Sequence, residues 1–112
     1  MCAGAWCCLH IWDRYQFSGD IKVLEDNFDI LADCCRFFID FLVEDPRNGY
    51  LVTCPSNSPE NAFIVPGTDK PANICAGPTM DNEILRELFH MTAESCRLLE
   101  REPELAEKLQ EM

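Results

Sequence analysis

Apolar side chains recur at helical spacing from the start of the chain. The pattern predicts a first helix over residues 4–17, and the glycine of Ser18-Gly19 is a typical helix stop. A second apolar pattern covers residues 21–43, with Asp20 as its expected N-cap and Asp45-Pro46 as its end. The apolar residues that define the first helix are Trp6, Leu9, Trp12 and Tyr15.

The second predicted helix is apolar around much of its circumference. A surface helix needs only one apolar stripe, so we expect this helix to be covered on more than one side. One face carries Leu24, Phe28, Leu31, Cys35, Phe38 and Leu42. The residues that lie well outside that face are Ile30, Cys34, Phe37, Phe41 and Val43.

Helical periodicity is absent from residues 44–79, which hold six of the seven prolines. Residues 50–54 are expected to pair with residues 62–65 as a short hairpin inside this loop. A long irregular connection within a compact domain is uncommon unless it has a function, so this loop is the first place to look for functional residues.

The last third of the chain again has a helical pattern. A third helix is predicted over residues 81–100, and Pro103 favours a fourth over residues 103–111. The predicted fold class is therefore all-α, with one elaborate loop between two helices. The residues of the third helix that should face the core are Ile84, Leu85, Leu88, Phe89, Met91, Cys96 and Leu99.

Composition limits the size of the fold and the kinds of partner. The chain has 112 residues, 47% of them hydrophobic, which suits one compact domain or part of a larger one. Its formal net charge of -11 disfavours nucleic acids and anionic membrane surfaces as partners. No apolar run approaches the ~20 residues that a membrane-spanning helix needs. The first residues lack the pattern of a secretory signal, and the sequence leaves both the compartment and the oligomeric state open.

Eight cysteines raise the question of disulfides. Cys7-Cys8 and Cys34-Cys35 are adjacent pairs within helical stretches, where neighbouring side chains point in different directions and do not bridge easily. The pattern favours buried free thiols, and a disulfide between Cys54 and Cys75 is the alternative. No C-x-x-C spacing is present and the two histidines have no partner at ligand spacing, so no metal site or cofactor is expected.

Three stretches carry recognisable motifs when they are taken in order. The first runs from Gly4-Ala-Trp6 through His10 to Asp20, and the second from Phe37 through Tyr50-Leu-Val-Thr-Cys-Pro-Ser-Asn-Ser-Pro-Glu60-Asn61. The third is Cys75-Ala-Gly-Pro-Thr-Met-Asp81. Together they resemble the catalytic domain of glycoside hydrolase family 95, the inverting α-L-fucosidases, with order and spacing preserved over nearly the whole chain.

The resemblance implies that residues 1–112 are part of an (α/α)6 toroid, with residues 44–79 as an active-site loop. It implies a fucosylated glycan as substrate, with 1,2-linked terminal fucose, and Glu60 as the general acid that protonates the leaving group. In the family a pair of asparagines and an aspartate activate the water. We expect those residues outside this chain, so the isolated 112 residues are expected to be inactive.

A general acid in this position needs an unusual pKa. A carboxyl that is protonated near neutral pH must have its pKa raised from about 4.3 toward 6 or more, which burial or a neighbouring negative charge achieves. Pro55 and Pro59 stiffen the backbone beside Glu60, and Phe63 and Ile64 are candidates for an apolar wall. Taken without the resemblance, the loop chemistry favours a solvated glutamate of ordinary pKa at position 60 over a general acid.

Three further residues are candidates for sugar contact. Trp6 and His10 lie one helical turn apart and share a face, where an aromatic ring and an imidazole suit a sugar pocket; the alternative is that both are packing residues. Asn61 stands where the resemblance leads us to expect a histidine in many relatives. Asn61 either orients Glu60, contacts the sugar or caps the turn, and this difference leaves substrate preference open.

Other polar residues have simpler interpretations. Asp81 is expected near the N-terminus of the third helix, where acidic residues are favoured, and not as a catalytic carboxylate. His90 and the acidic run over residues 100–111 are expected on the solvated surface. Two other functions remain open on the sequence: a small acidic helical module that binds a protein through its apolar second helix, and the same fold acting on α-L-galactosides.

Overall fold

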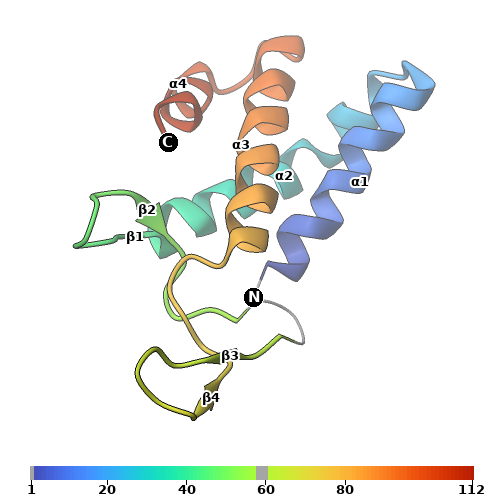
Figure 1. Cartoon of the computed structure of the whole chain (residues 1–112). Helices are drawn as coiled ribbons and strands as arrows, with labels where there is room; N and C mark the ends of the chain where they lie inside the picture. The colour runs from blue at the N-terminus through green and yellow to red at the C-terminus, as the bar shows by residue number, and fades with distance from the viewer. Residues whose placement is uncertain (1, 58–60) are drawn as a thin grey trace.

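The computed structural model describes residues 2–57 and 61–112 and contains four helices and two small antiparallel strand pairs in those ranges (Figure 1). The predicted all-α class is confirmed, and it is consistent with a helical fragment of an (α/α)6 toroid. The helices are α1 (Ala3–Ser18), α2 (Lys22–Phe41), α3 (Thr79–Leu98) and α4 (Pro103–Glu111). The strands are β1 (Val43–Glu44), β2 (Leu51–Val52), β3 (Phe63–Ile64) and β4 (Pro71–Ala72).

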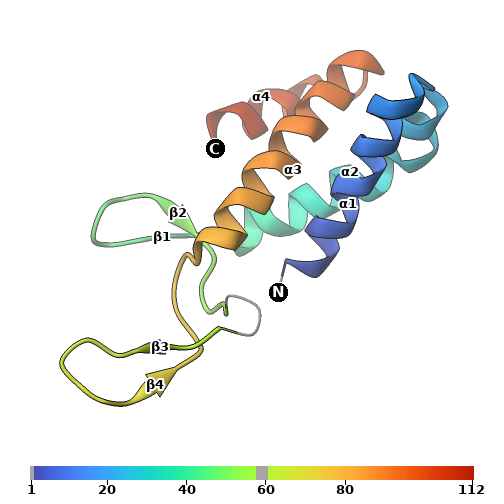
Figure 2. The same ribbon diagram turned by 45° about the vertical axis from the view of Figure 1, so that its right-hand side comes forward.

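Helix α3 is the centre of the bundle. It packs against α1, α2 and α4, and α1 also packs against α2 (Figure 2). Its apolar face is buried as the spacing predicts, with Leu99 partly buried at the edge. The largest apolar side chains that are fully buried in the described residues are Phe28, Leu24, Leu31, Leu88 and Met91.

The ends of the first two helices follow from local chemistry. Gly19 adopts a left-handed conformation with φ of 67°, and its amide donates to the Tyr15 carbonyl at 2.8 Å, which ends α1. The Asp20 carboxylate accepts the Lys22 amide at 3.1 Å and so caps the start of α2. Regular helix stops at Phe41, before the predicted end, because the next residues extend into β1.

The turn between α3 and α4 is held against α2 by charged side chains. Glu102 is left-handed with φ of 46° and pairs with Arg36 of α2. Arg101 pairs with Asp29 at 2.9 Å, and its guanidinium lies 4.2 Å from the centroid of the Phe28 ring. These contacts explain how a short polar turn between two helices keeps a fixed position on the bundle.

The described residues cover only part of the second apolar side of α2, where Cys34 and Phe41 are half-buried against the core. Ile30 and Phe37 are 56% and 54% exposed, and Phe37 stacks on Phe41 with ring centroids 5.7 Å apart. α2 nevertheless packs against both α1 and α3, so two helices cover it while Ile30 and Phe37 remain exposed among the described residues. None of the helices in the described ranges is long and apolar enough to cross a membrane.

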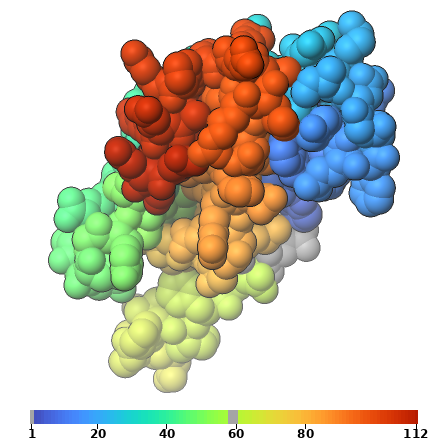
Figure 3. Space-filling view, turned by 90° about the horizontal axis from the view of Figure 1, so that it is seen from above, coloured from blue at the N-terminus to red at the C-terminus, as the bar shows by residue number. Residues whose placement is uncertain are grey.

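The described residues of the α2–α3 connection (42–57 and 61–78) form two separate strand pairs, and Figure 3 shows them as green and yellow-green lobes that project from the helices. β1 pairs with β2, and β3 pairs with β4, so the predicted pairing of residues 50–54 with 62–65 is wrong. The two links that form, residues 45–50 and 65–70, each contain a glycine, whereas the predicted link over residues 55–61 has two prolines and no glycine. Gly49 and Gly67, with φ of 77° and 78°, make those two turns possible.

All eight cysteines are free thiols, and Cys54 is not bridged to Cys75. Four are buried, whereas Cys7 and Cys54 are exposed and the other two are half-buried, so the expected burial holds for half of them. Hydrogen bonding with Cys34 lowers the pKa of the Cys8 thiol. The four buried cysteines are Cys2, Cys8, Cys35 and Cys96.

Candidate active site

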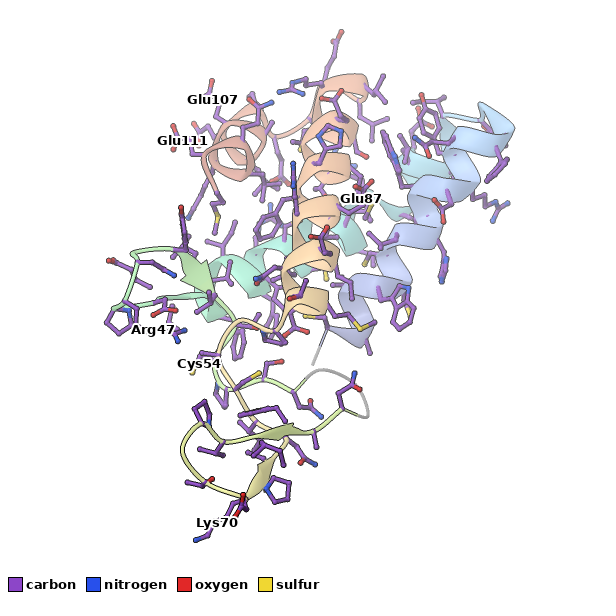
Figure 4. All side chains as sticks on the ribbon, viewed as in Figure 1. Arg47, Cys54, Lys70, Glu87, Glu107 and Glu111 are labelled. Carbon is purple, nitrogen blue, oxygen red and sulfur yellow. The ribbon has the colours of Figure 1, made fainter. Side chains whose placement is uncertain are left out.

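The β1–β2 turn is fixed by a buried carboxylate. The amide of Asp45 donates to the Tyr50 carbonyl, and the amide of Gly49 donates to the Asp45 carbonyl, each at 2.8 Å. The Asp45 carboxylate accepts the Arg47 amide at 2.9 Å and the Arg47 guanidinium at 2.6 Å. These hydrogen bonds from Arg47 lower the pKa of Asp45 to about 2. Arg47 and Cys54 both lie on the connection, away from the acidic side chains of α4 (Figure 4).

A second buried carboxylate lies between the connection and the helices. Asp81, Thr53 and Ser56 are only 2%, 0% and 4% exposed. Thr53 Oγ1 donates to Asp81 Oδ2 at 2.7 Å, and Ser56 Oγ donates to the same oxygen. Burial and the hydrogen bond to Asp81 raise the pKa of the Cys2 thiol to about 12, so the start of α1 also contacts this carboxylate. We call Thr53, Ser56 and Asp81 the loop anchor.

Backbone hydrogen bonds reinforce the loop anchor. The Ser56 amide donates to the Cys75 carbonyl at 3.0 Å, and the Cys75 amide donates to the Ser56 carbonyl at 2.8 Å. The Gly77 amide donates to the Thr53 carbonyl at 2.9 Å. Gly77 is left-handed with φ of 60°, and a Cβ placed there would lie 2.8 Å from Cγ1 of Val52. Glycine is therefore required at this position by both conformation and space.

The structure places three of the four predicted site residues within the described ranges. Trp6 and His10 are both exposed on α1 among the described residues, and Nδ1 of His10 lies 3.8 Å from Oδ2 of Asp13. Asn61 is exposed on the connection. Glu60 lies outside the described residues. The roles of all four residues remain predictions.

A surface depression lies beside the loop anchor. It has a volume of about 330 Å³ and combines apolar surface with two carboxamides. Its lining includes Ser56 of the loop anchor and the neighbouring Asn57. The full lining is Pro55, Ser56, Asn57, Asn73 and Ile74. Within the described ranges, no group of three or more His, Cys, Asp or Glu side chains could hold a metal ion.

Comparison with known proteins gives the family. The profile of the glycosyl hydrolase family 95 catalytic domain matches residues 1–112. The chain belongs to glycosyl hydrolase family 95. The resemblance found in the three motifs is thereby confirmed.

Two curated proteins are similar to this family 95 chain. Alpha-L-fucosidase 2 of Arabidopsis thaliana is 38% identical over 87 residues, which is 77% of this chain and 10% of the relative. Probable alpha-fucosidase A of Aspergillus niger is 37% identical over 89 residues, which is 76% of this chain and 10% of the relative. The chain thus spans about a tenth of the length of these two relatives.

The loop anchor gives a physical meaning to two of the family 95 motifs. Thr53 and Ser56 come from the second motif, and Gly77 and Asp81 come from the third. Asp81 lies in the first turn of α3 as expected, but its carboxylate accepts hydroxyls of the connection and does not cap the helix. The sequence analysis did not identify Thr53 and Ser56 as partners of Asp81. The signal that could have indicated them was two hydroxyl residues beside prolines in a long loop.

Proposed function

We propose that this chain is part of a glycoside hydrolase that removes terminal α-(1,2)-linked L-fucose from glycans with inversion, with Glu60 as the general acid. The observation that carries the proposal is the family 95 match together with two relatives named as fucosidases. A neutral glycan is compatible with the net charge of -11, which repels polyanions. Family membership favours an enzyme over a non-catalytic interaction module.

The proposed chemistry assigns one proton transfer to this chain. Glu60 donates a proton to the glycosidic oxygen as the bond to the anomeric carbon breaks, and a water attacks from the opposite face of the sugar. In inverting glycosidases the acid and the water-activating group stand ~6.5 to 9.5 Å apart to leave room for that water. The water-activating residues are proposed to lie outside residues 1–112, so the isolated chain should not turn over.

The proposed substrate contacts come from α1 and from the connection. Trp6 is exposed and presents its ring to solvent, as a residue that stacks on the apolar face of a sugar must. His10 and Asn61 are exposed as well and offer polar groups for hydroxyls. These contacts alone favour neither fucose nor the closely related α-L-galactose, so substrate profiling decides between them.

The test uses the complete protein, meaning the product of the reading frame that contains residues 1–112. Its substrate is a 2′-fucosylated oligosaccharide, compared with the α-L-galactosyl analogue. Glu60→Gln should lower kcat about 100-fold or more, which is the usual contribution of general acid catalysis, while circular dichroism stays unchanged. The matched control is Glu87→Gln, an exposed glutamate of α3 (Figure 4), which should keep the wild-type rate.

Two results would count against the proposal. The first is wild-type hydrolysis by Glu60→Gln in the complete protein. The second is Glu60-dependent hydrolysis by the isolated 112 residues, which would contradict the proposed location of the water-activating groups. Inversion is checked separately by NMR of the first sugar released, because an inverting enzyme on an α-fucoside yields the β anomer.

A further inference from the structure

The buried carboxylate of Asp81 joins three parts of the chain that are distant in sequence. Asp81 belongs to α3, its hydroxyl donors Thr53 and Ser56 lie 28 and 25 residues earlier, and the thiol of Cys2 at the start of α1 hydrogen-bonds to it. Both hydroxyls donate to the same oxygen, Oδ2. One carboxylate oxygen therefore fixes two points of the connection relative to the helices.

Burial makes these hydrogen bonds consequential. A carboxylate removed from water needs donors to replace its hydration, and hydrogen bonds to an ionised acceptor are stronger than those between neutral groups. Thr53 is completely buried and Ser56 nearly so. Asp81→Asn keeps an acceptor oxygen but removes the charge, so the hydrogen bonds from the two buried hydroxyls become weaker and the segment that carries them is held less firmly.

The loop anchor lies close to the proposed acid along the chain. Ser56 precedes Glu60 by four residues, and it is held by Asp81 through its side chain and by Cys75 through its backbone. On the far side of Glu60, Phe63 pairs with Ala72 in the β3–β4 pair. The described residues on either side of Glu60 in the sequence, Ser56 and Phe63, are therefore each paired with a residue of the 72–75 stretch.

We infer that Asp81 is a positioning residue for the general acid, acting through Ser56 and Thr53. This inference rests on the proposed function of Glu60. Asp81 is buried, and in this proposal it acts by fixing the backbone at Ser56, four residues before Glu60 in the sequence. Displacing a catalytic group by about 1 Å is enough to lower a rate by about 100-fold, so a rigid attachment four residues away has a direct kinetic consequence.

The test exploits the leaving group, because positioning of an acid matters only where the leaving group needs a proton. In the complete protein, Asp81→Asn and Ser56→Ala are compared with wild type on two substrates. One is a 2′-fucosylated oligosaccharide, whose sugar leaving group requires protonation, and the other is a nitrophenyl fucoside, whose leaving group does not. Asp81→Asn should lower kcat on the oligosaccharide about 10- to 100-fold, with a much smaller loss on the nitrophenyl fucoside and little change in KM.

Hydrogen exchange supplies a second readout that does not depend on catalysis. The amides of Ser56, Cys75 and Gly77 donate within the paired segment, so peptides covering residues 53–57 and 72–77 should exchange faster in Asp81→Asn. Peptides from the middle of α3 should keep their wild-type rate. The matched control is Asp45→Asn, which removes a buried carboxylate of the connection and leaves the loop anchor intact. This variant should change kcat on the two substrates by the same factor or not at all.

The outcomes separate this inference from the proposed function. If Glu60→Gln shows the leaving-group-selective loss and Asp81→Asn does not, the positioning role is wrong and the general acid stands. If Asp81→Asn slows both substrates by the same factor, Asp81 is only structural and the inference is wrong. If Glu60→Gln shows no selective loss, the proposed function fails and this inference fails with it. Should Asp81→Asn not fold, Ser56→Ala must show the selective loss, and wild-type selectivity in that variant overturns the inference.

Discussion

Gly77→Ala tests whether the connection is held as closely to α3 as the structure indicates. Gly77 has φ of 60°, and a Cβ there would lie 2.8 Å from Cγ1 and 3.1 Å from Cβ of Val52. Gly67 is the matched control, because its φ of 78° is similarly left-handed while a Cβ there would have no atom within 4 Å. The two substitutions therefore differ in steric overlap and share the conformational penalty.

The expected magnitudes follow from these two terms. A non-glycine residue in the left-handed region costs about 1 kcal/mol, and both variants incur that cost. Forcing a methyl group into a filled space costs a further 1 to 3 kcal/mol, roughly, and only Gly77→Ala incurs it, because Val52 is buried. We expect a loss of about 2 to 4 kcal/mol at Gly77 and about 1 kcal/mol at Gly67.

Hydrogen–deuterium exchange of the Ser56 and Cys75 amides is the appropriate assay, because each of these amides donates to the carbonyl of the other residue, close to Gly77. A loss of about 2 to 4 kcal/mol corresponds to exchange roughly 30- to 700-fold faster, at about 1.4 kcal/mol per factor of ten. Gly67→Ala should leave these two amides unchanged. The double variant Val52→Ala/Gly77→Ala removes Cγ1 and should recover part of the protection.

One result would refute the reasoning about this contact. If Gly77→Ala and Gly67→Ala had equal effects on the Ser56 and Cys75 amides, then Val52 would not be in the close contact that the structure shows. Failure of the double variant to recover protection would carry the same meaning.

Three further predictions concern other parts of the chain. Asp45 has a pKa of about 2 when folded against about 3.9 unfolded. Its stabilisation by Arg47 is therefore complete above about pH 4 and is lost as the pH falls toward 2. An acid titration followed by NMR should show this loss in the β1–β2 turn of the wild type and not in Asp45→Asn. Cys54 is exposed, whereas Cys35 is buried with its pKa raised to about 12 by that burial. Iodoacetamide without denaturant should therefore label Cys54 and not Cys35, and equal labelling of these two residues by mass spectrometry would contradict the fold. Leu88→Ala should lower the free energy of unfolding of the bundle by about 2 to 5 kcal/mol, because the side chain is fully buried. A decrease of less than about 1 kcal/mol in thermal melting would show that α3 is not central to the bundle.

The helices were predictable because their signals are local. Apolar residues spaced three and four apart lie on one helix face whatever the rest of the chain does. The glycine stop at Gly19 and the Asp20 cap depend on neighbours within a few residues. The family was predictable for a different reason, since three motifs in fixed order are specific even where no single motif is.

The loop pairing was not predictable from composition. Residues 50–54 and 62–65 have similar apolar character, and nothing in either run specifies a partner. The structure pairs Leu51-Val52 with Val43-Glu44, and Phe63-Ile64 with Pro71-Ala72. Each link that forms contains a left-handed glycine, Gly49 or Gly67, whereas the predicted link over residues 55–61 has no glycine to supply a left-handed turn position.

By itself, the sequence determined the helical class, the approximate extent of four helices, the buried face of α3 and membership of family 95. Only the tertiary structure decided that Asp81 binds Thr53 and Ser56 and that Trp6 is exposed. The physical reason is the separation in sequence of the residues that interact. Helix formation is governed by contacts within one turn, whereas the loop anchor joins residues 25 and 28 positions apart. Such contacts exist only after α3 has packed.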